Sequence, residues 1–517
     1  MENIKEKILF QMLMNCTKFI FALVVMLLMT PFIINKLGIE DFGVWCMVIA
    51  IVGFFSLIDF GLGTAVVKCV ASLNDKKEAQ SRNEKLSTYC LLYVMLALIG
   101  SVCMYPIFVN IGELFSLSPH YQYTAQCLLI ILALRTFIMA LPLSLFRAIL
   151  FGSGYISEVS FVNILGTFIY ASLVFLFVQM GYGIIYLGIA NIIAVAIEYI
   201  IYILLAYRYL PDLKIKLSFV KLTHAKEITS LSIAAILIQV SGLIMLKTDP
   251  LIIKIFLSLT AVSLYSVALK ITENFVLLIK QISHVLAPKF CELSQENNNR
   301  QISTLYLNTT RHILAISALI ASVIAIHSEL FLTLWLGNEF TEAAPVLIIL
   351  IASAVILAPQ LIAGDLLMMS GNHRTSAWFA ALSLLMNLIL SIFLVKIMGI
   401  TGVALATLIS TLLVGLSLIS IISRKILKIK IAYLLRRAII PALIPTLIFI
   451  GMSFIINSLN TNLNIILFAS FNISVFFISL YVFWIKTLIA SERLMIINKF
   501  SLLRQRLFKA TLSTDIA

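Results

Sequence analysis

The chain has 517 residues, of which 62% are hydrophobic and 12% are charged, and its formal net charge is +14 at pH 7. Soluble domains carry about a quarter of their residues as charges. The composition therefore excludes an ordinary soluble protein and predicts a protein that crosses a membrane many times.

Long apolar segments recur from one end of the chain to the other. A helix needs about 20 apolar residues to cross the hydrocarbon core of a bilayer. The segments are long and rich in Leu and Ile, whereas the strands of a membrane barrel alternate polar and apolar residues over about ten positions. We therefore predict an all-α polytopic membrane protein with about fourteen transmembrane helices. The predicted segments are 8–35, 42–67, 86–111, 122–148, 159–180, 184–207, 228–256, 260–286, 311–335, 344–369, 377–397, 402–423, 438–457 and 463–486.

Neither a cleaved leader nor a disulfide framework is predicted. The first segment is longer than a signal-peptide core and no small-residue cleavage site follows it, so we expect it to be a helix of the mature protein. The seven cysteines lie in or beside apolar segments without the spacing of a metal site. We therefore expect no metal.

Basic residues are concentrated in alternate loops. With the N-terminus in the cytoplasm, the cytoplasmic loops and the C-terminal tail hold most of them, which is the positive-inside pattern. We therefore expect both termini in the cytoplasm. The charge is explained by topology without a nucleic-acid partner. The tail, 491–517, is either a basic amphipathic helix on the anionic inner leaflet or a solvated segment. The basic residues of these regions include Lys68, Lys76, Lys77, Arg82, Lys85, Arg208, Lys214, Lys216, Lys221, Lys226, Arg424, Lys425, Lys428, Lys430, Arg436, Arg437, Arg493, Lys499, Arg504, Arg506 and Lys509, against Lys36, Lys254 and Lys396 in the outer loops.

The two halves of the chain resemble each other at a nearly constant offset. TPFII at 30–34 matches DPLII at 249–253, and FGSGYIS at 151–157 lies opposite MSGNHRT at 369–375. Such a repeat indicates a duplication. Six helices per copy give two parallel lobes, 1–210 and 211–430, with two further helices in 431–490. Parallel repeats around a central cavity are typical of transporters that work by alternating access.

Two stretches resemble a known family. LGIEDFGVWCMVIAIVGFFSLIDFGLGTAVVKCVASL, residues 37–73, is similar to the second-helix signature of bacterial polysaccharide and O-antigen flippases. LMNLILSIFLVKIMGITGVALATLIS, residues 385–410, is similar to a later stretch of the same superfamily, which also holds MATE exporters and lipid II flippases. The resemblance implies translocation of an undecaprenyl-pyrophosphate-linked oligosaccharide from the cytoplasmic to the periplasmic leaflet. It also implies membrane lipids as partners, and a polysaccharide polymerase and a chain-length regulator as further candidate partners.

Two alternatives stay open. A MATE-type exporter of cationic drugs shares this fold, but its cavity would be acidic, whereas cations at least equal anions within these segments. A membrane-embedded enzyme of glycan assembly would use acidic residues in the first outer loop, where Glu40 and Asp41 lie. That loop is short, and acids beside a helix N-terminus are favourable without any catalysis. We expect a transporter that is not an enzyme.

Charged residues inside the segments are the candidate functional groups, because each costs a few kcal/mol at the centre of a bilayer. Lys270, Glu273 and Lys280 share one helix face. Lys18 lies about 15 Å into its helix. Four of the cations are predicted to bind the pyrophosphate or acidic sugars, although pairing with carboxylates for packing is the alternative for each. These four cavity cations are Lys18, Arg135, Lys270 and Lys280, and the intramembrane acids are Asp59, Glu198, Asp249 and Glu273.

The carboxylates and two prolines have a second predicted role. Asp59, Asp249 or Glu273 would bind a coupling H⁺ or Na⁺, or Asp59 would simply end or bend its helix. Lys247 and Asp249, in the outer half of their helix, are interpreted as an ion-pair latch. Pro31 and Pro250 align in the repeat and are predicted to be hinges, because proline bends a helix. No other cofactor is expected.

Overall fold

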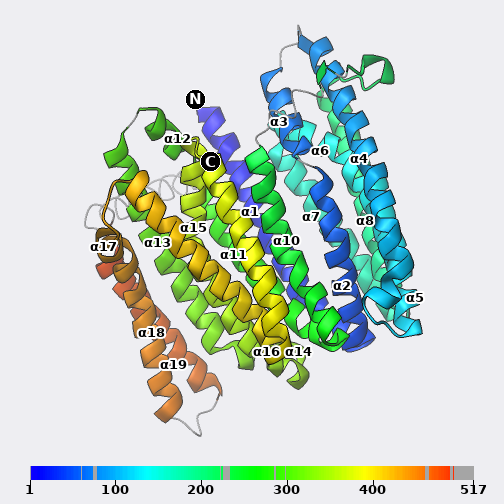
Figure 1. The fold of residues 1–517 in the computed structure, drawn as a ribbon. Coiled ribbons are helices and arrows are strands. Elements are labelled where there is room, and N and C mark those ends of the chain that lie inside the picture. Colours follow the sequence, from blue (N-terminus) through cyan, green and yellow to red (C-terminus); the bar gives the residue numbers. More distant parts are fainter. Residues whose placement is uncertain are drawn as a thin grey trace, which may run out of the picture. The chain divides into compact units, whose positions relative to one another are not determined.

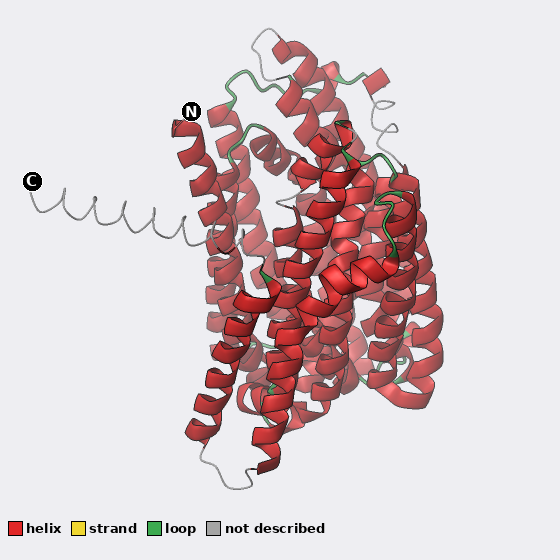
Figure 2. Cartoon of the chain, turned by 90° about the vertical axis from the view of Figure 1, so that its left-hand side faces the viewer, coloured by secondary structure: helices red, strands yellow, loops and turns green. Residues whose placement is uncertain are grey.

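The computed structural model describes residues 2–59, 61–73, 78–221, 223–224, 233–284, 287–296, 298–459, 465–488 and 493. Within these ranges the regular elements are all helices and no strand occurs (Figure 2). Helices satisfy their own backbone hydrogen bonds, which a bilayer requires because it holds no water. The predicted all-α fold is confirmed. The predicted basic tail, 491–517, lies outside the described residues apart from Arg493.

The first half of the chain forms eight long or medium helices joined by short turns (Figure 1). They are α1 (Glu2–Leu37), α2 (Ile39–Phe55), η1 (Ser56–Asp59), α3 (Leu62–Ser72), α4 (Ala79–Leu114), α5 (Pro119–Ala133), η3 (Leu134–Ala140), α6 (Leu141–Gly152), α7 (Ile156–Gln179), α8 (Ile185–Tyr209) and η4 (Leu217–Phe219).

The second half continues in the same manner. Its helices are α10 (Ile233–Phe256), α11 (Leu259–His284), α12 (Ala287–Gln295), α13 (Asn299–Ile326), α14 (Ser328–Leu336), η5 (Asn338–Glu342), α15 (Ala343–Met369), α16 (His373–Lys425), α17 (Ile431–Leu434), η6 (Leu435–Ile439), α18 (Ile440–Leu459), α19 (Ile465–Val482) and η7 (Phe483–Thr487).

Each of the fourteen predicted segments lies on helix in the described chain. Ten helices are long and apolar enough to cross a membrane, among the residues that the structure describes. One of them, α16, holds two segments, because Gly399 breaks it with a φ of 59°. The other three segments lie on α2 to α3, on α10 and on α19, where the helix is broken or only partly described. The chain is thus a multi-pass membrane protein.

The described chain divides into two compact units. Unit 1 contains Met1–Lys270, Leu332–Val346 and His373–Ser410. Unit 2 contains Ile271–Phe331, Leu347–Asn372 and Thr411–Ala517. The boundaries of the two predicted lobes stay a prediction, because the compactness of a unit does not test a sequence repeat.

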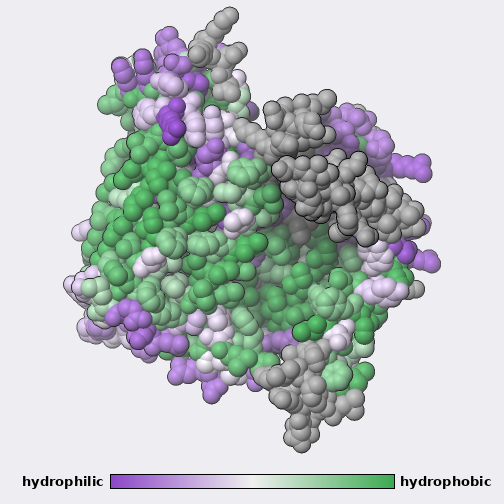
Figure 3. Space-filling view, turned by 180° about the vertical axis from the view of Figure 1, so that it is seen from behind, coloured by the Kyte–Doolittle hydropathy of each residue, from purple (hydrophilic) through white to green (hydrophobic). Residues whose placement is uncertain are grey.

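The outer surface of unit 1 is apolar around its middle. Leu98 and Val102 of α4 are 64% and 73% exposed, and Phe168 of α7 is 58% exposed. Figure 3 shows, on its left side, a green apolar belt between hydrophilic ends. A soluble surface rarely keeps so large an apolar area, so this belt is the surface that faces lipid.

Two helix ends that the repeat aligns have the same backbone geometry. Gly154 has a φ of 81° and Gly371 a φ of 78°. After α6, Tyr155 N–H donates to Leu150 O at 3.0 Å, and after α15, Asn372 N–H donates to Leu367 O at 2.8 Å. This is a glycine C-cap, in which the left-handed residue lets the chain close the last turn. The sequence repeat therefore extends to matching backbone conformations.

Pro31 lies inside α1 and leaves one carbonyl of that helix without its donor. A proline has no N–H, so the carbonyl four residues earlier, Leu27 O, loses its helical hydrogen bond. Trp335 of α14 fills the gap, because its Nε1–H donates to Leu27 O at 2.7 Å. The hydrogen bond that α1 loses at Pro31 is thus replaced by one from a side chain 308 residues further along the chain.

A second contact lies at the same end of unit 1. The positions of the basic loops predict that this end lies on the side of the membrane away from the cytoplasm. A Cβ at Gly43 of α2 would lie 2.3 Å from Leu259 O of α11, so the two helices touch backbone to backbone. Ser263 Oγ donates to Ile39 O across the same junction. Together with the Trp335 hydrogen bond, these contacts join α1 to α14 and α2 to α11 at the predicted outer end of unit 1.

Replacing Trp335 with phenylalanine is expected to loosen this end. The orphaned Leu27 carbonyl loses its donor, at a cost of about 1 kcal/mol, which changes the open population roughly fivefold. The measurement is the rate at which a membrane-impermeant maleimide labels a cysteine that replaces Leu259, which is only 7% exposed, in a cysteine-free background. Trp378→Phe is the matched control, since Trp378 is 77% exposed. Equal labelling rates in the two variants would contradict this role of Trp335.

Candidate functional site

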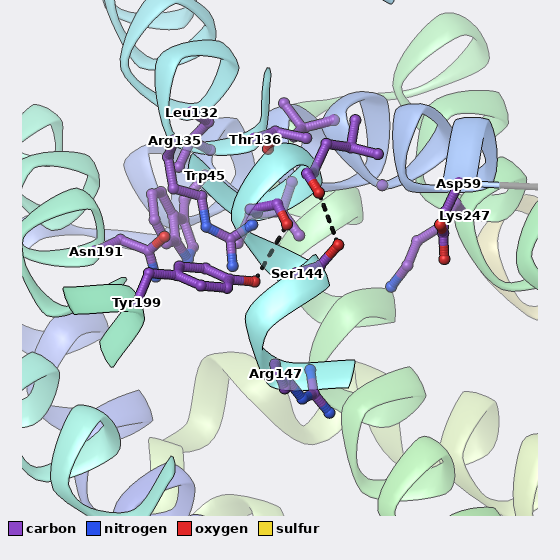
Figure 4. A pocket seen from close by; sticks show the side chains of 15 residues that line it. Trp45, Asp59, Leu132, Arg135, Thr136, Ser144, Arg147, Asn191, Tyr199 and Lys247 are labelled. Atoms are coloured by element: carbon purple, nitrogen blue, oxygen red, sulfur yellow. Dashed lines mark hydrogen bonds between the residues drawn. The ribbon is translucent and has the colours of Figure 1, made fainter. Parts of the chain in front are cut away.

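A cavity of about 460 Å³ lies within unit 1, among α2, η1, the helices from α5 to α6, α8 and α10 (Figure 4). Three cations and one carboxylate face it, namely Arg135, Arg147, Lys247 and Asp59. Its wall is therefore positive. The other lining residues are Trp45, Ile49, Val52, Gly53, Leu132, Thr136, Ala140, Leu141, Ser144, Asn191 and Tyr199.

A π turn brings the two arginines to one side of their helix. Residues 134–140 form π-helix, and Leu141 N–H donates to Thr136 O, five residues earlier. Pro142 follows this turn, and the wide turn accommodates a ring that would clash with the preceding turn of an α-helix. In regular helix, twelve residues would separate Arg135 and Arg147 by about 120°. The one extra residue reduces the separation to about 20°, so both side chains reach the cavity.

Arg135 is half-buried, and one of its donors lacks a partner in the described chain. Its Nε is buried and has no hydrogen-bond partner among the described residues. Nearby, Tyr199 Oη donates to Ala140 O at 3.2 Å, which ties α8 to the π turn (Figure 4). Five N–H groups in a planar fork suit phosphate or carboxylate binding. An arginine in this setting can bind an anion without first breaking an internal ion pair.

Lys247 and Asp59 approach the cavity from its other side. A Cβ at Gly53 of α2 would lie 3.1 Å from Lys247 Cδ, so the lysine stem lies over this glycine. Asp59 lies at the break between α2 and α3, against Tyr93 and Gly63. Its Oδ1 is buried without a hydrogen-bond partner in the described chain. Asp59 therefore both ends a helix and lines the cavity.

Lys18 belongs to the neighbourhood of the cavity but does not line it. It is half-buried on α1 and lies within electrostatic range of Arg147. On the same face of α1, Gln11 Nε2 donates to Gly154 O at 2.8 Å. This face of α1 thus packs toward the end of α6, with Lys18 adding positive potential.

Asp249 lies in a second polar cluster of unit 1. The carboxylate is 2% exposed, and its Oδ2 accepts hydrogen bonds from Tyr265 of α11 and from Thr407 of α16, the latter at 3.3 Å. Asn387 Nδ2 donates to Thr407 Oγ1 at 2.9 Å, and Ser391 lies beside the carboxylate. Two buried oxygens, Asp249 Oδ1 and Asn387 Oδ1, have no hydrogen-bond partner within the described residues.

This second cluster can hold a small cation or a proton. Its groups are oxygens from a carboxylate, an amide and hydroxyls, which are hard ligands. The unpartnered oxygens of Asp249 and Asn387 are the atoms available to such an ion. Asp249 and Lys247 lie two residues apart on α10. Asp249 belongs to this cluster, whereas Lys247 lines the cavity.

The charged residues predicted to share one face of α11 are divided between the two units. Lys270 is exposed at the end of unit 1, and Glu273 and Lys280 are half-buried in unit 2. The residues that line the cavity all belong to unit 1. Of the four predicted cavity cations, Arg135 lines this cavity and Lys18 lies nearby, whereas Lys270 and Lys280 are not among its lining residues. Lys247, which was predicted to form an ion-pair latch with Asp249, lines the cavity as well.

The acidic pair at the start of α2 has ordinary helix-end contacts. Tyr121 Oη donates to Glu40 Oε2 at 2.7 Å. Burial raises the pKa of Asp41, and the nearby His120 opposes that rise. Both acids lie in the first turn of α2, where the helix dipole stabilises negative charge. These contacts explain the pair without any chemistry.

Several residues of the two sites were missed by the sequence analysis. Arg147 lies twelve residues from Arg135, a spacing that does not put two side chains on one α-helix face, so only the Pro142 signal of a distorted turn could have revealed it. Trp45, Asn191 and Tyr199 carry no charge and gave no signal. Thr407 and Asn387 lie in an apolar run, and only their distance in the fold joins them to Asp249.

Comparisons with known proteins bear on both the family and the fold. A family model described as "Polysaccharide biosynthesis protein" matches residues 4–294. Over 189 residues the chain is 28% identical to the "Probable low-salt glycan biosynthesis flippase Agl15" of Haloferax volcanii, which covers 36% of this chain and 40% of that protein. The alignment thus spans well under two thirds of that relative.

Two solved structures share the fold. Lipid II flippase MurJ in an inward closed conformation gives a TM-score of 0.71 at 17% identity, covering 92% of this chain and 99% of that one. An inward-facing multidrug resistance MATE family transporter of the MOP superfamily gives 0.64 at 15% identity, covering 78% of this chain and 92% of that one. At such low identity the likeness concerns the fold alone.

Proposed function

Because the chain belongs to the polysaccharide biosynthesis protein family, we propose that it is a flippase for a lipid-linked oligosaccharide. The proposed cargo is an undecaprenyl-pyrophosphate-linked repeat unit of O-antigen or a similar surface polysaccharide. It moves from the cytoplasmic to the periplasmic leaflet of a bacterial inner membrane by alternating access. Both termini of the protein are proposed to lie in the cytoplasm, as the basic loops indicate.

The positive cavity of unit 1 is the observation that carries this proposal. Arg135, Arg147 and Lys247 outnumber the single carboxylate of Asp59. A pyrophosphate must shed water to enter the protein, and arginine N–H groups replace that water with charge-assisted hydrogen bonds. Arg135, whose Nε has no hydrogen-bond partner in the described chain, is proposed as the first of these donors, with Arg147 beside it and Lys247 as a point charge.

The Asp249 cluster is proposed as the coupling site. A carboxylate in the membrane is costly unless it has a partner, and here that partner would be a co-transported H⁺ or Na⁺. Binding would favour one state of the helices that meet there, because Tyr265, Thr407 and Asn387 come from α11 and from both limbs of α16. Pro31 and Pro250, each inside its helix, are proposed as hinges of that motion. Lys270 and Lys280 of α11 stay proposed cations for the cargo, and Glu273 stays a proposed carboxylate for the coupling ion.

Export of cationic drugs is the competing function, and the MATE likeness favours it only at the level of fold. The cavity's charge argues against it. A cationic drug would be repelled by three basic groups facing one acid. An anionic cargo is attracted by the same groups.

Loss of the gene tests the proposal. We expect undecaprenyl-pyrophosphate-linked units to accumulate in the cytoplasmic leaflet and surface glycan to disappear, measured by extracting lipid-linked oligosaccharide and probing its accessibility from outside. Complementation with the wild-type chain is the control. Mature glycan that persisted in a strain without another flippase would overturn the proposal, and a change in drug sensitivity alone would support the exporter.

A further inference from the structure

Glu198 is an intramembrane carboxylate that the mechanism above leaves unused. It lies near the middle of α8, and the next residue, Tyr199, lines the cavity. Glu198 itself does not line it. A negative charge placed beside a cation site inside a membrane needs an explanation, because each such charge costs a few kcal/mol.

A notch on the neighbouring helix α7 holds the carboxylate. A Cβ built at Gly166 would lie 1.7 Å from Glu198 Oε1 and 2.3 Å from its Cδ. Only glycine leaves this space, and Gly166 is buried. The side chain therefore lies in the wall behind the cavity and not within the space that a cargo would fill.

From this notch Glu198 acts on both cavity arginines at a distance. It lies within electrostatic range of Arg147 of α6 and of Arg135 of η3, with Tyr199 and Tyr202 as its titratable neighbours on α8. No ion pair within 4 Å joins it to either arginine in the described part of the chain. The arginine N–H groups therefore remain available while part of their charge is compensated.

We propose that Glu198 is a built-in counter-charge that limits how tightly the cavity holds an anionic cargo. This inference rests on the proposed function. A flippase has to release what it binds, and it then has to return empty through a closed state in which its cations repel one another. A fixed carboxylate behind Arg135 and Arg147 lowers both barriers, because it weakens the field at the cavity without occupying the donors.

The test measures binding and turnover separately. Glu198→Gln is expected to bind inorganic pyrophosphate about tenfold more tightly than the wild type, since an opposing charge several ångströms away is removed. Its net flipping of undecaprenyl pyrophosphate in proteoliposomes is expected to slow at the same time. The affinity is measured by calorimetry on the purified full chain. Glu198→Asp keeps the charge and is expected to stay near the wild type.

Two further variants separate charge from packing. Glu113→Gln makes the same chemical change on an exposed residue of α4 and is expected to alter neither affinity nor rate. In an Arg135→Ala background the affinity gain of Glu198→Gln is expected to shrink, because the two residues act through one field. An undiminished gain in that background, or unchanged affinity in Glu198→Gln, would overturn the inference.

The outcomes also separate this inference from the proposed function. If the wild type binds pyrophosphate and Glu198→Gln binds it no more tightly, the proposed role of Glu198 is wrong, while the proposed anion-binding role of the cavity is retained. If neither the wild type nor any variant binds pyrophosphate, the proposed anion site fails first, and the counter-charge fails with it.

Discussion

Arg135→Ala is expected to reduce flipping roughly 100-fold at normal protein levels. The substitution removes a planar donor from a desolvated site, and truncating one partner of such a pair costs about 3 kcal/mol. Arg135→Lys keeps the charge but loses the fork, so we expect an intermediate loss of about tenfold. The measurement is the initial rate of undecaprenyl-pyrophosphate-sugar translocation in proteoliposomes.

A matched control keeps this result specific. Arg208 is exposed in the last turn of α8, and Arg208→Ala removes the same charge outside the cavity. We expect it to leave the rate near that of the wild type. If Arg135→Ala also transported at the wild-type rate, Arg135 would belong to the packing of its helix and the cavity would need another anion donor.

Asp249→Asn is expected to uncouple transport from its driving ion. The amide has the shape of the carboxylate and its oxygen still accepts the hydrogen bond from Tyr265, so the fold should survive. A neutral amide attracts neither H⁺ nor Na⁺ as a carboxylate does. We expect an imposed ion gradient to accelerate the wild type about tenfold or more and the variant hardly at all, measured in proteoliposomes with a pH or a sodium gradient in turn.

The control for Asp249 is another aspartate in the same unit. Asp212 is exposed in the turn after α8, and Asn83 binds its backbone carbonyl, not its side chain. Asp212→Asn is expected to keep full gradient dependence. Continued acceleration of Asp249→Asn by either gradient would move the coupling site elsewhere.

The sequence predicted the parts of this protein that depend on local pattern. The membrane segments follow from runs of apolar residues, and the described part of each of the fourteen lies on helix. The alignment of Gly154 with Gly371 predicted a repeat, and both residues close a helix in the same conformation. Arg135 was found because a charge in an apolar helix has to be explained.

The rest depends on distances that a sequence does not contain. Asp249 accepts hydrogen bonds from Tyr265 and from Thr407, 158 residues away, and Asn387 joins them through Thr407. Their association could therefore only come from the fold. Trp335 and Leu27 are 308 residues apart. Nothing in the sequence indicates that the Trp335 indole donates to the carbonyl that Pro31 leaves without its helical partner. Arg147 was missed for a geometric reason, since the regular helical period places it on the wrong face.

If the cavity selects its cargo as proposed, the π turn at residues 134–140 allows that selectivity to change through an insertion or deletion, without any substitution of a charged residue. Deleting one exposed residue there, such as Ile138, would restore the regular register and rotate everything that follows by about 100°. Arg147 would then leave the cavity with its own codon unchanged, provided that Pro142 were replaced to avoid its clash with the preceding turn. Relatives that handle less acidic glycans could thus differ by an insertion or deletion in this helix, which a column-by-column comparison of charged residues would overlook.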